Sequence, residues 1–274
     1  ILEERGLRCL RLEALPRDPR TWPEDLRSVV FLAEPAGGDP LCLVHDSCHR
    51  LLATVQALIR APGKPVRLVL LTRGSQALRG SAGDPAQATL WGMARAVAIE
   101  HPELRFLRVD LPEDGSPQDL GRVAKEMLLH PCEDELALRE GALLAPRLRP
   151  ASAGIPPEGP FPVHPEGAYL LTGGTGGLGL ALAGWLVSRG ARELLLISRR
   201  GVHTPEQARA VAELEAAGCR VEVARVDVAD REALARTLAP LASRLRGVVH
   251  AAGVADLGLV VEQDPERLEA VLRP

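Results

Sequence analysis

Apolar positions in the N-terminal half of the chain alternate between short runs and stretches with helical spacing. The short runs have the length of buried strands, and they lie at 29–33, 67–72 and 105–110. In the intervening stretches apolar residues recur every three or four positions, which predicts helices at 41–60, 86–100 and 117–130. A turn around Arg139, Glu140 and Gly141 predicts a closing hairpin. Alternating strands and helices indicate a parallel sheet with helices on its faces.

The C-terminal half repeats this rhythm with clearer element ends. Its predicted strands are 168–172, 193–198, 220–224 and 247–250. The helix that starts at Leu178 is expected to end at Gly190, a residue suited to a left-handed helix end. Thr204 and Gln207 have the spacing of a capping box, and Asp230 is a further N-cap. A last helix is expected to start at Asp264-Pro265.

A proline-rich stretch separates the two halves. Residues 146–166 contain seven prolines, which cannot donate the backbone hydrogen bonds of a helix or a central strand. We therefore predict two Rossmann-like α/β subdomains with parallel sheets, at 1–145 and 167–274, joined by a stiff linker. The two halves look like distant copies of one design, but only the second carries a glycine-rich loop.

Composition and charge exclude several classes of protein. The 274 residues include 46% hydrophobic and 25% charged residues, as in ordinary globular proteins. The net charge of −3 predicts no nucleic acid or anionic membrane as partner, and no apolar run reaches the length of a membrane span. Ile1–Arg5 lacks a signal-peptide pattern, so a cytoplasmic location is expected. The five scattered cysteines predict no disulfide framework.

One short segment contains four residues of types that can bind metals. Cys42, His45, Cys48 and His49 all fall within a single predicted helix. Residues on one helix cannot surround an ion from all four tetrahedral directions, and structural zinc sites usually draw ligands from two segments. The sequence therefore predicts no metal site here.

The strongest chemical signal is a glycine-rich loop between a predicted strand and a predicted helix. It consists of Thr172, Gly173, Gly174, Thr175, Gly176, Gly177, Leu178 and Gly179. Glycine permits positive φ in such a turn and lets the backbone approach a diphosphate, which the helix N-terminus attracts. The plain alternative is a glycine-rich turn without a ligand.

The end of the next predicted strand indicates which cofactor the loop binds. Ser198, Arg199 and Arg200 lie there, at the position that faces the adenosine ribose in this architecture. A carboxylate would accept a hydrogen bond from the 2′-hydroxyl of NADH, whereas guanidinium groups bind the 2′-phosphate of NADPH. The sequence therefore predicts NADPH. The alternative is two arginines that only face solvent.

Two further strand ends complete the predicted cofactor site. Asp227 and Val228 follow the third strand, where Asp227 could accept from the adenine amino group or merely cap its turn. The fourth strand ends at His250, which we expect to be a structural, hydrogen-bonded residue. The small residues that follow would let a cofactor lie along the sheet edge, and they are Ala251, Ala252 and Gly253.

Together these motifs resemble the short-chain dehydrogenase/reductase superfamily, and more closely the ketoreductase domain of modular polyketide synthases. The N-terminal half resembles the structural subdomain of that family, which binds no cofactor. The segments that carry this second resemblance are Leu90–Arg95, Ala98–Pro102, Arg105–Leu111 and Glu133–Gly141. The first half, which lacks the glycine fingerprint, disfavours a free-standing dehydrogenase.

The resemblance implies NADPH-dependent reduction of a β-ketoacyl thioester, carried on an acyl carrier protein, beside other polyketide synthase domains. In the family a tyrosine donates the proton, assisted by a lysine, a serine and an asparagine. None of the four can be placed here, because Tyr169 precedes the glycine loop and Lys64 and Lys125 lie in the other half. We expect the catalytic residues beyond Pro274. The alternative is a non-catalytic pseudo-ketoreductase that scaffolds neighbouring domains.

Further expectations concern the substrate side and the core. Asp256 and Leu257 lie where many such reductases carry Leu-Asp-Asp, but the motif is incomplete, so no product configuration is assigned. The continuous join between the halves predicts no inserted enoylreductase. Trp91 and Trp185 lie on apolar helix faces and are expected in the core.

Overall fold

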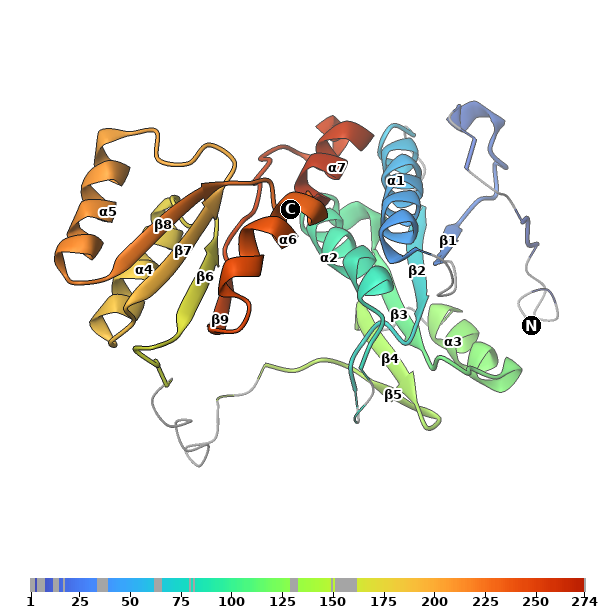
Figure 1. Ribbon diagram of the computed structural model, residues 1–274. Helices are drawn as coiled ribbons and strands as arrows, with labels where there is room; N and C mark the ends of the chain where they lie inside the picture. The colour runs from blue at the N-terminus through green and yellow to red at the C-terminus, as the bar shows by residue number, and fades with distance from the viewer. Residues whose placement is uncertain are drawn as a thin grey trace. The chain divides into compact units, whose positions relative to one another are not determined.

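The chain forms two α/β units in a computed structural model (Figure 1). It describes residues 3, 8–11, 15–16, 18–33, 39–61, 66–78, 80, 82–128, 133–148, 150 and 162–273. Unit 1 comprises residues 1–149 and 257–268, and unit 2 comprises 150–256 and 269–274. The predicted α/β class is thereby confirmed. Most of the predicted linker, namely 149 and 151–161, lies outside the described residues, and the subdomain limits stay a prediction.

Unit 1 contains a five-stranded sheet whose strands lie side by side in the order of the sequence. The strands are β1 (Ser28–Leu32), β2 (Arg67–Arg73), β3 (Leu107–Leu111), β4 (Glu135–Arg139) and β5 (Ala142–Leu144). The first four are parallel, and β5 pairs antiparallel with β4 as the predicted hairpin. The helices are α1 (Pro40–Ile59), α2 (Pro85–Glu100) and α3 (Pro117–Leu128), with short 3-10 turns at Pro19–Thr21, Pro102–Leu104 and Val260–Glu262.

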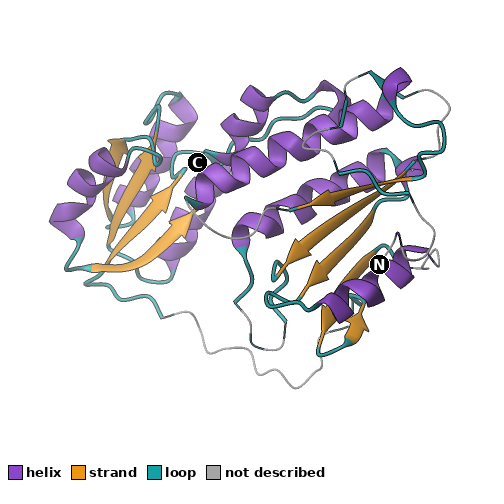
Figure 2. Cartoon of the chain, turned by 90° about the vertical axis from the view of Figure 1, so that its right-hand side faces the viewer, coloured by secondary structure: helices purple, strands orange, loops and turns teal. Residues whose placement is uncertain are grey.

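Two cores hold this sheet between its helices (Figure 2). On one face Phe31 and Leu70 pack with apolar residues of α1 and α2, and on the other face Val69 and Val109 pack with α3. The predicted strand at 105–110 begins later than expected. Pro102 starts a 3-10 turn and Arg105 has a φ of 43°, a left-handed conformation that cannot belong to a strand.

The carboxyl edge of β2 and β3 is filled by a buried polar network. The fully buried Asp110 carboxylate accepts from the Thr72 hydroxyl at 2.7 Å and from the Ser75 hydroxyl at 2.8 Å. Arg139 pairs with the same carboxylate at 2.5 Å, and the Trp91 indole donates to Thr72 at 2.9 Å. These polar groups make their hydrogen bonds with one another. The carboxyl edge of β2 and β3 is therefore filled by side chains of unit 1 itself.

A late segment of the chain completes unit 1. The Gln56 amide donates to the carbonyls of Val260 at 3.1 Å and Gln263 at 2.7 Å. The Val260 N–H donates to the Glu100 carboxylate at 2.7 Å, and the Val260 side chain is buried in the core with Leu51 and Val97. Segment 257–268 is therefore held to α1 and α2 by both polar and apolar contacts.

Unit 2 contains a four-stranded parallel sheet in the order β8-β7-β6-β9. The strands are β6 (Ala168–Thr172), β7 (Glu193–Ser198), β8 (Arg220–Arg225) and β9 (Leu245–His250). Its helices are α4 (Gly177–Ser188), α5 (Pro205–Ala216) and α6 (Arg231–Leu238), with a 3-10 turn at Ala239–Leu241. Helix α7 (Pro265–Leu272) belongs to unit 1 up to residue 268 and to unit 2 from residue 269. The strand order reverses at β6, between β7 and β9. In α/β sheets this switch point is where a crevice opens at the carboxyl ends.

Local sequence signals in unit 2 are reproduced by the structure, with one exception. Thr204 and Gln207 form the predicted capping box, and Gly190 has a φ of 107°. Trp185 of α4 was expected in the core, and this expectation is wrong, since the side chain is 42% exposed beneath Arg189. Trp91 in α2 of unit 1, for which the same was expected, is buried. Helix α4 is apolar on all sides, so its sequence pattern does not define which face meets the sheet.

The helices that the structure describes do not meet the requirements of a membrane span. None of them combines the length and the apolar character that crossing a bilayer needs.

Candidate functional site

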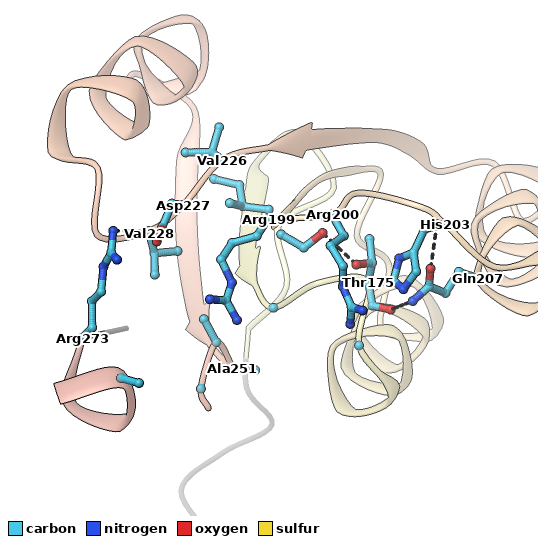
Figure 3. A pocket seen from close by; sticks show the side chains of 17 residues that line it. Thr175, Arg199, Arg200, His203, Gln207, Val226, Asp227, Val228, Ala251 and Arg273 are labelled. Carbon is cyan, nitrogen blue, oxygen red and sulfur yellow. Dashed lines mark hydrogen bonds and ion pairs between the residues drawn. The ribbon is translucent and has the colours of Figure 1, made fainter. Parts of the chain in front are cut away.

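A pocket of about 250 Å³ lies at the carboxyl ends of the unit 2 strands (Figure 3). Most of the residues that the sequence analysis assigned to a cofactor line it. These are Gly173, Thr175, Gly176, Ser198, Arg199, Arg200, Asp227, Val228, Ala251, Ala252 and Gly253. The structure thus brings together residues from four strand ends that are separated by up to 80 positions in the sequence.

Other predicted residues do not line this pocket. They are Thr172, Gly174, Gly177, Leu178, Gly179, Asp256 and Leu257. Thr172 is buried beneath the loop, where its hydroxyl bonds to His250 Nδ1 at 2.8 Å and accepts from the Ala252 N–H at 3.1 Å. This bond agrees with the structural role expected for His250. Leu257 lies outside the pocket with its side chain exposed.

Three glycines of the loop are required by the protein's own backbone. Gly173 has a φ of +64°, and a Cβ there would lie 2.5 Å from the Ala251 carbonyl. A Cβ on Gly179 would lie 2.4 Å from the Gly173 carbonyl, and one on Gly174 would lie 2.8 Å from Leu171 O. A Cβ on Gly177 would meet nothing within 4 Å. Gly177 therefore leaves open space at the start of α4.

The N-terminus of α4 lacks a side-chain cap. Its N-cap is Gly176, which has no side chain to accept from the first turn. The other six helices that the structure describes are capped by a side-chain oxygen, and the residues are Asp39 for α1, Asp84 for α2, Ser116 for α3, Thr204 for α5, Asp230 for α6 and Asp264 for α7. The first N–H groups of α4 and its dipole are thus available to an anion.

Arg199 and Arg200 extend along the pocket from the end of β7 (Figure 3). Both are exposed, and no carboxylate of the described part of the chain pairs with either. The neighbouring Ser198 side chain is already hydrogen-bonded within the protein. Its Oγ accepts from the Thr175 hydroxyl at 2.8 Å and from the Gly201 N–H at 2.9 Å. These contacts fix the loop that carries two uncompensated guanidinium groups.

Asp227 lies on the far wall of the pocket, beside Arg273. Its Oδ1 accepts from the Ala229 N–H at 3.1 Å, which is the turn-capping role that the sequence left open. Its Oδ2 lies 3.4 Å from Arg273 Nη2. The carboxylate remains a pocket-lining acceptor, and Figure 3 shows the Arg273 side chain reaching toward it.

Several lining residues were not found by sequence reasoning. They are Ile197, His203, Gln207, Val226, Ala270 and Arg273. Gln207 was identified only as a capping residue, yet its amide also donates to the Thr175 carbonyl of the glycine loop at 2.9 Å. Arg273 gave no signal, because it is 46 residues from its partner Asp227.

The structure also places the residues that could have been proton donors. The chain's single tyrosine, Tyr169, is 1% exposed, and its hydroxyl accepts from the His164 N–H at 2.7 Å. Lys125 is in α3 of unit 1, and Lys64 lies outside the described residues. No tyrosine or lysine is among the described residues that line the pocket.

The cysteine and histidine residues of α1 do not form a group that could hold a metal ion. His45 and His49 stack with 6.2 Å between ring centroids, and Cys48 is fully buried. Burial raises the pKa of the Cys48 thiol to about 11. In the described part of the chain, no three His, Cys, Asp or Glu side chains are grouped to hold a metal ion.

Two family models match consecutive parts of the chain. The model described as "KR domain" matches residues 167–274. The model described as "Polyketide synthase extender module SpnB, Rossmann fold domain" matches residues 10–148.

Curated relatives are large synthases. The spectinabilin polyketide synthase system protein NorA of Streptomyces orinoci is 40% identical over 90% of this chain, which spans 13% of that protein. The polyketide synthase GfsB of Streptomyces halstedii is 38% identical over 90% of the chain, which spans 5% of it. The chain is therefore similar to a small part of each relative.

Two solved ketoreductase structures are similar to this chain over nearly its whole length. One described as an A1-type ketoreductase superposes with a TM-score of 0.84 and 36% identity, over 99% of this chain and 60% of that one. The first ketoreductase of the tylosin PKS gives a TM-score of 0.74 and 31% identity, over 91% of this chain and 52% of that one.

Proposed function

Because the chain belongs to the ketoreductase domains of modular polyketide synthases, we propose that it holds NADPH for reduction of a β-ketoacyl thioester. The product is the β-hydroxyacyl thioester, and the substrate is carried on an acyl carrier protein beside neighbouring synthase domains. When bound, NADPH supplies a hydride to the keto carbon. The residues of this chain bind and orient the cofactor.

The observation that carries the proposal is a pocket with two separate anion-binding features, neither of them paired with a carboxylate of the described residues. The uncapped start of α4 offers N–H groups to a diphosphate. Arg199 and Arg200 offer paired N–H donors to a 2′-phosphate at the end of β7. NADPH has both groups, whereas NADH lacks the second.

Other residues of the pocket have supporting roles in this proposal. Thr175, Ser198 and Gly201 hold the arginine loop to the glycine loop through their shared hydrogen bonds. Asp227 accepts from the adenine amino group with the oxygen that now faces Arg273. Ala251 has a side chain small enough to leave room along the sheet edge.

A second candidate function is a pseudo-ketoreductase that scaffolds neighbouring domains without catalysis. The buried, hydrogen-bonded hydroxyl of Tyr169 cannot reach a substrate, so the residues described in this chain contribute cofactor binding to either function. The two functions differ in one measurement. Ketone-dependent NADPH consumption by the synthase that contains this chain supports the reductase, and cofactor binding without consumption supports the scaffold.

The test of the cofactor is an Arg199→Ala variant titrated with NADPH and with NADH, followed by the fluorescence of the reduced nicotinamide. Loss of a charge-assisted contact of about 1.5–3 kcal/mol raises the Kd for NADPH by about 10- to 150-fold and leaves that for NADH unchanged. Arg189→Ala is the matched control, since it removes the same charge from an arginine that contacts Trp185 outside the pocket. Equal losses for both cofactors would refute the assignment.

A further inference from the structure

We propose that His203 is a third phosphate-binding cation of the pocket, and that its protonation is coupled to the binding of a 2′-phosphate. This inference rests on the proposed function, because the 2′-phosphate is the group that distinguishes NADPH from NADH. His203 lines the pocket together with Arg199 and Arg200 (Figure 3).

The orientation of the ring determines what each protonation state offers to an anion. His203 Nδ1 lies 3.1 Å from the Gly201 carbonyl oxygen. Because a carbonyl oxygen can only accept, Nδ1 carries a hydrogen in either state. In the neutral ring, Nε2 then carries an unprotonated lone pair, which repels a phosphate oxygen. Nε2 of the imidazolium is an N–H that donates to it, so only the protonated ring binds phosphate.

The backbone of His203 is fixed to the rest of the cofactor site. Its N–H donates to Gln207 Oε1 at 2.9 Å, and the amide of the same Gln207 donates to the Thr175 carbonyl at 2.9 Å. Gly201, whose carbonyl accepts from the ring, has a φ of +67° and donates to Ser198 Oγ at 2.9 Å. His203 is therefore tied through two routes to the glycine loop and to the end of β7, rather than lying on a free loop.

The charges around the ring set the direction of the effect. The charged or titratable residues that line the pocket are Arg199, Arg200, His203, Asp227 and Arg273. The Asp227 carboxylate is engaged by the Ala229 N–H and Arg273. A phosphate dianion is thus the missing counter-charge of Arg199, Arg200 and, when it is protonated, His203.

Two further charged residues lie on elements next to the loop that carries His203. Glu206 lies in the first turn of α5, where its own backbone N–H and the Thr204 hydroxyl lower the pKa of its carboxyl. Arg225 of β8 places its side chain 2.8 Å from where a Cβ on Gly201 would be. Neither is among the residues that line the pocket.

Proton uptake is the signature of this arrangement. The neutral His203 ring must gain a proton before its Nε2 can donate, so binding of a phosphate by this nitrogen takes up a proton. Arginines alone act in the opposite direction, since they favour the dianion of a phosphate monoester, whose second pKa is about 6, and displace its remaining proton. The sign of the proton exchange therefore separates the two cases.

The experiment is isothermal titration calorimetry at pH 7 in PIPES and in Tris, whose ionisation enthalpies differ, with NADPH and NADH as the probes. In the unmodified chain, NADPH binding takes up several tenths of a proton and NADH binding takes up none. His203→Gln abolishes the uptake and weakens NADPH binding by about 10-fold at pH 6, an effect that fades above pH 8.

A second variant separates this role from a merely structural one. His203→Lys supplies a permanent cation, so NADPH affinity returns while both the proton uptake and the pH dependence of affinity stay lost. Unchanged proton uptake in His203→Gln would overturn the inference while leaving the NADPH preference intact. Absence of NADPH binding to the unmodified chain at every pH would instead overturn the proposed function.

Discussion

The two sheets of this chain end in opposite ways at their carboxyl edges. In unit 1 the edge of β2 and β3 is closed by Asp110, which binds Thr72, Ser75 and Arg139. In unit 2 the edge of β6 and β7 is left open as a pocket, which is lined by glycines of the loop and by Arg199 and Arg200. In the same architecture, a few side chains therefore decide whether the edge is filled by the protein's own polar groups or forms an open pocket.

Strand order contributes to the same difference. The described strands of unit 1 follow one another in sequence order, so each crossover runs in the same direction. In unit 2 the chain leaves β6 first toward β7 and later returns to β9 on its other side. Crossovers to opposite sides separate the loops at the carboxyl ends, and a pocket forms between them.

The largest effect is expected from removing the carboxylate that closes the unit 1 edge. Asp110→Ala leaves the Arg139 guanidinium and the Thr72 and Ser75 donors without their acceptor in a buried site. We expect the free energy of unfolding of unit 1 to fall by about 3–5 kcal/mol, measured by urea unfolding with tryptophan fluorescence. Asp114→Ala is the control, since it removes the same charge from an exposed position. Equal losses would show that the network contributes nothing.

Among the cysteines that the structure describes, Cys48 and Cys219 are buried and can report on each unit separately. Burial raises the pKa of Cys48 in unit 1 to about 11 and raises that of Cys219 in unit 2. A raised pKa leaves less reactive thiolate, so at pH 8 roughly one Cys48 thiol in a thousand is ionised, and the fraction grows tenfold per pH unit. Both should label slowly, after the exposed Cys9 and Cys42.

NADPH should change only one of these two labelling rates. At 100 times its Kd a ligand stabilises the unit that binds it by about 2.7 kcal/mol, so labelling of Cys219 slows by up to about 100-fold. Labelling of Cys48, measured by mass spectrometry of the same samples in mild urea, stays the same. Equal protection of both thiols would mean that the units do not open independently.

A smaller effect on stability is expected from substitutions in the glycine loop of unit 2. Gly179→Ala brings a Cβ to 2.4 Å from the Gly173 carbonyl, so unit 2 should lose about 1–3 kcal/mol of stability. Gly177→Ala meets nothing within 4 Å and should leave stability unchanged or raise it by up to about 1 kcal/mol. Thermal unfolding followed by circular dichroism measures both variants. A loss in Gly177→Ala as large as in Gly179→Ala would contradict the assignment.

Sequence reasoning succeeded where the signal is local. The Thr204–Gln207 capping box and the loop from Gly173 to Gly179 depend on residues a few positions apart, and both lie where they were expected. It failed for Trp185, because an all-apolar helix gives no face to choose. The cofactor role of the predicted site residues stays a prediction, since the geometry shows a pocket and not its ligand.

The remaining features depend on contacts between distant residues. Arg273 joins the pocket wall through Asp227, and His203 through Gln207 and Gly201. The filling of the unit 1 edge was also not foreseen, since Asp110 reads in the sequence as the polar end of a strand. Such groups become visible only when the strand ends are brought together in space.

The return of segment 257–268 to unit 1 has a consequence for the order in which the molecule is made. Gln56 binds partners that follow it by 204 and 207 residues, and Val260 is part of the core of α1 and α2. At about 5–20 residues per second, a ribosome takes about 10–40 s to supply them. The half of the chain that is translated first therefore cannot complete its core until unit 2 has almost entirely emerged, and a gene fragment cut at residue 149 would encode an unfinished unit 1.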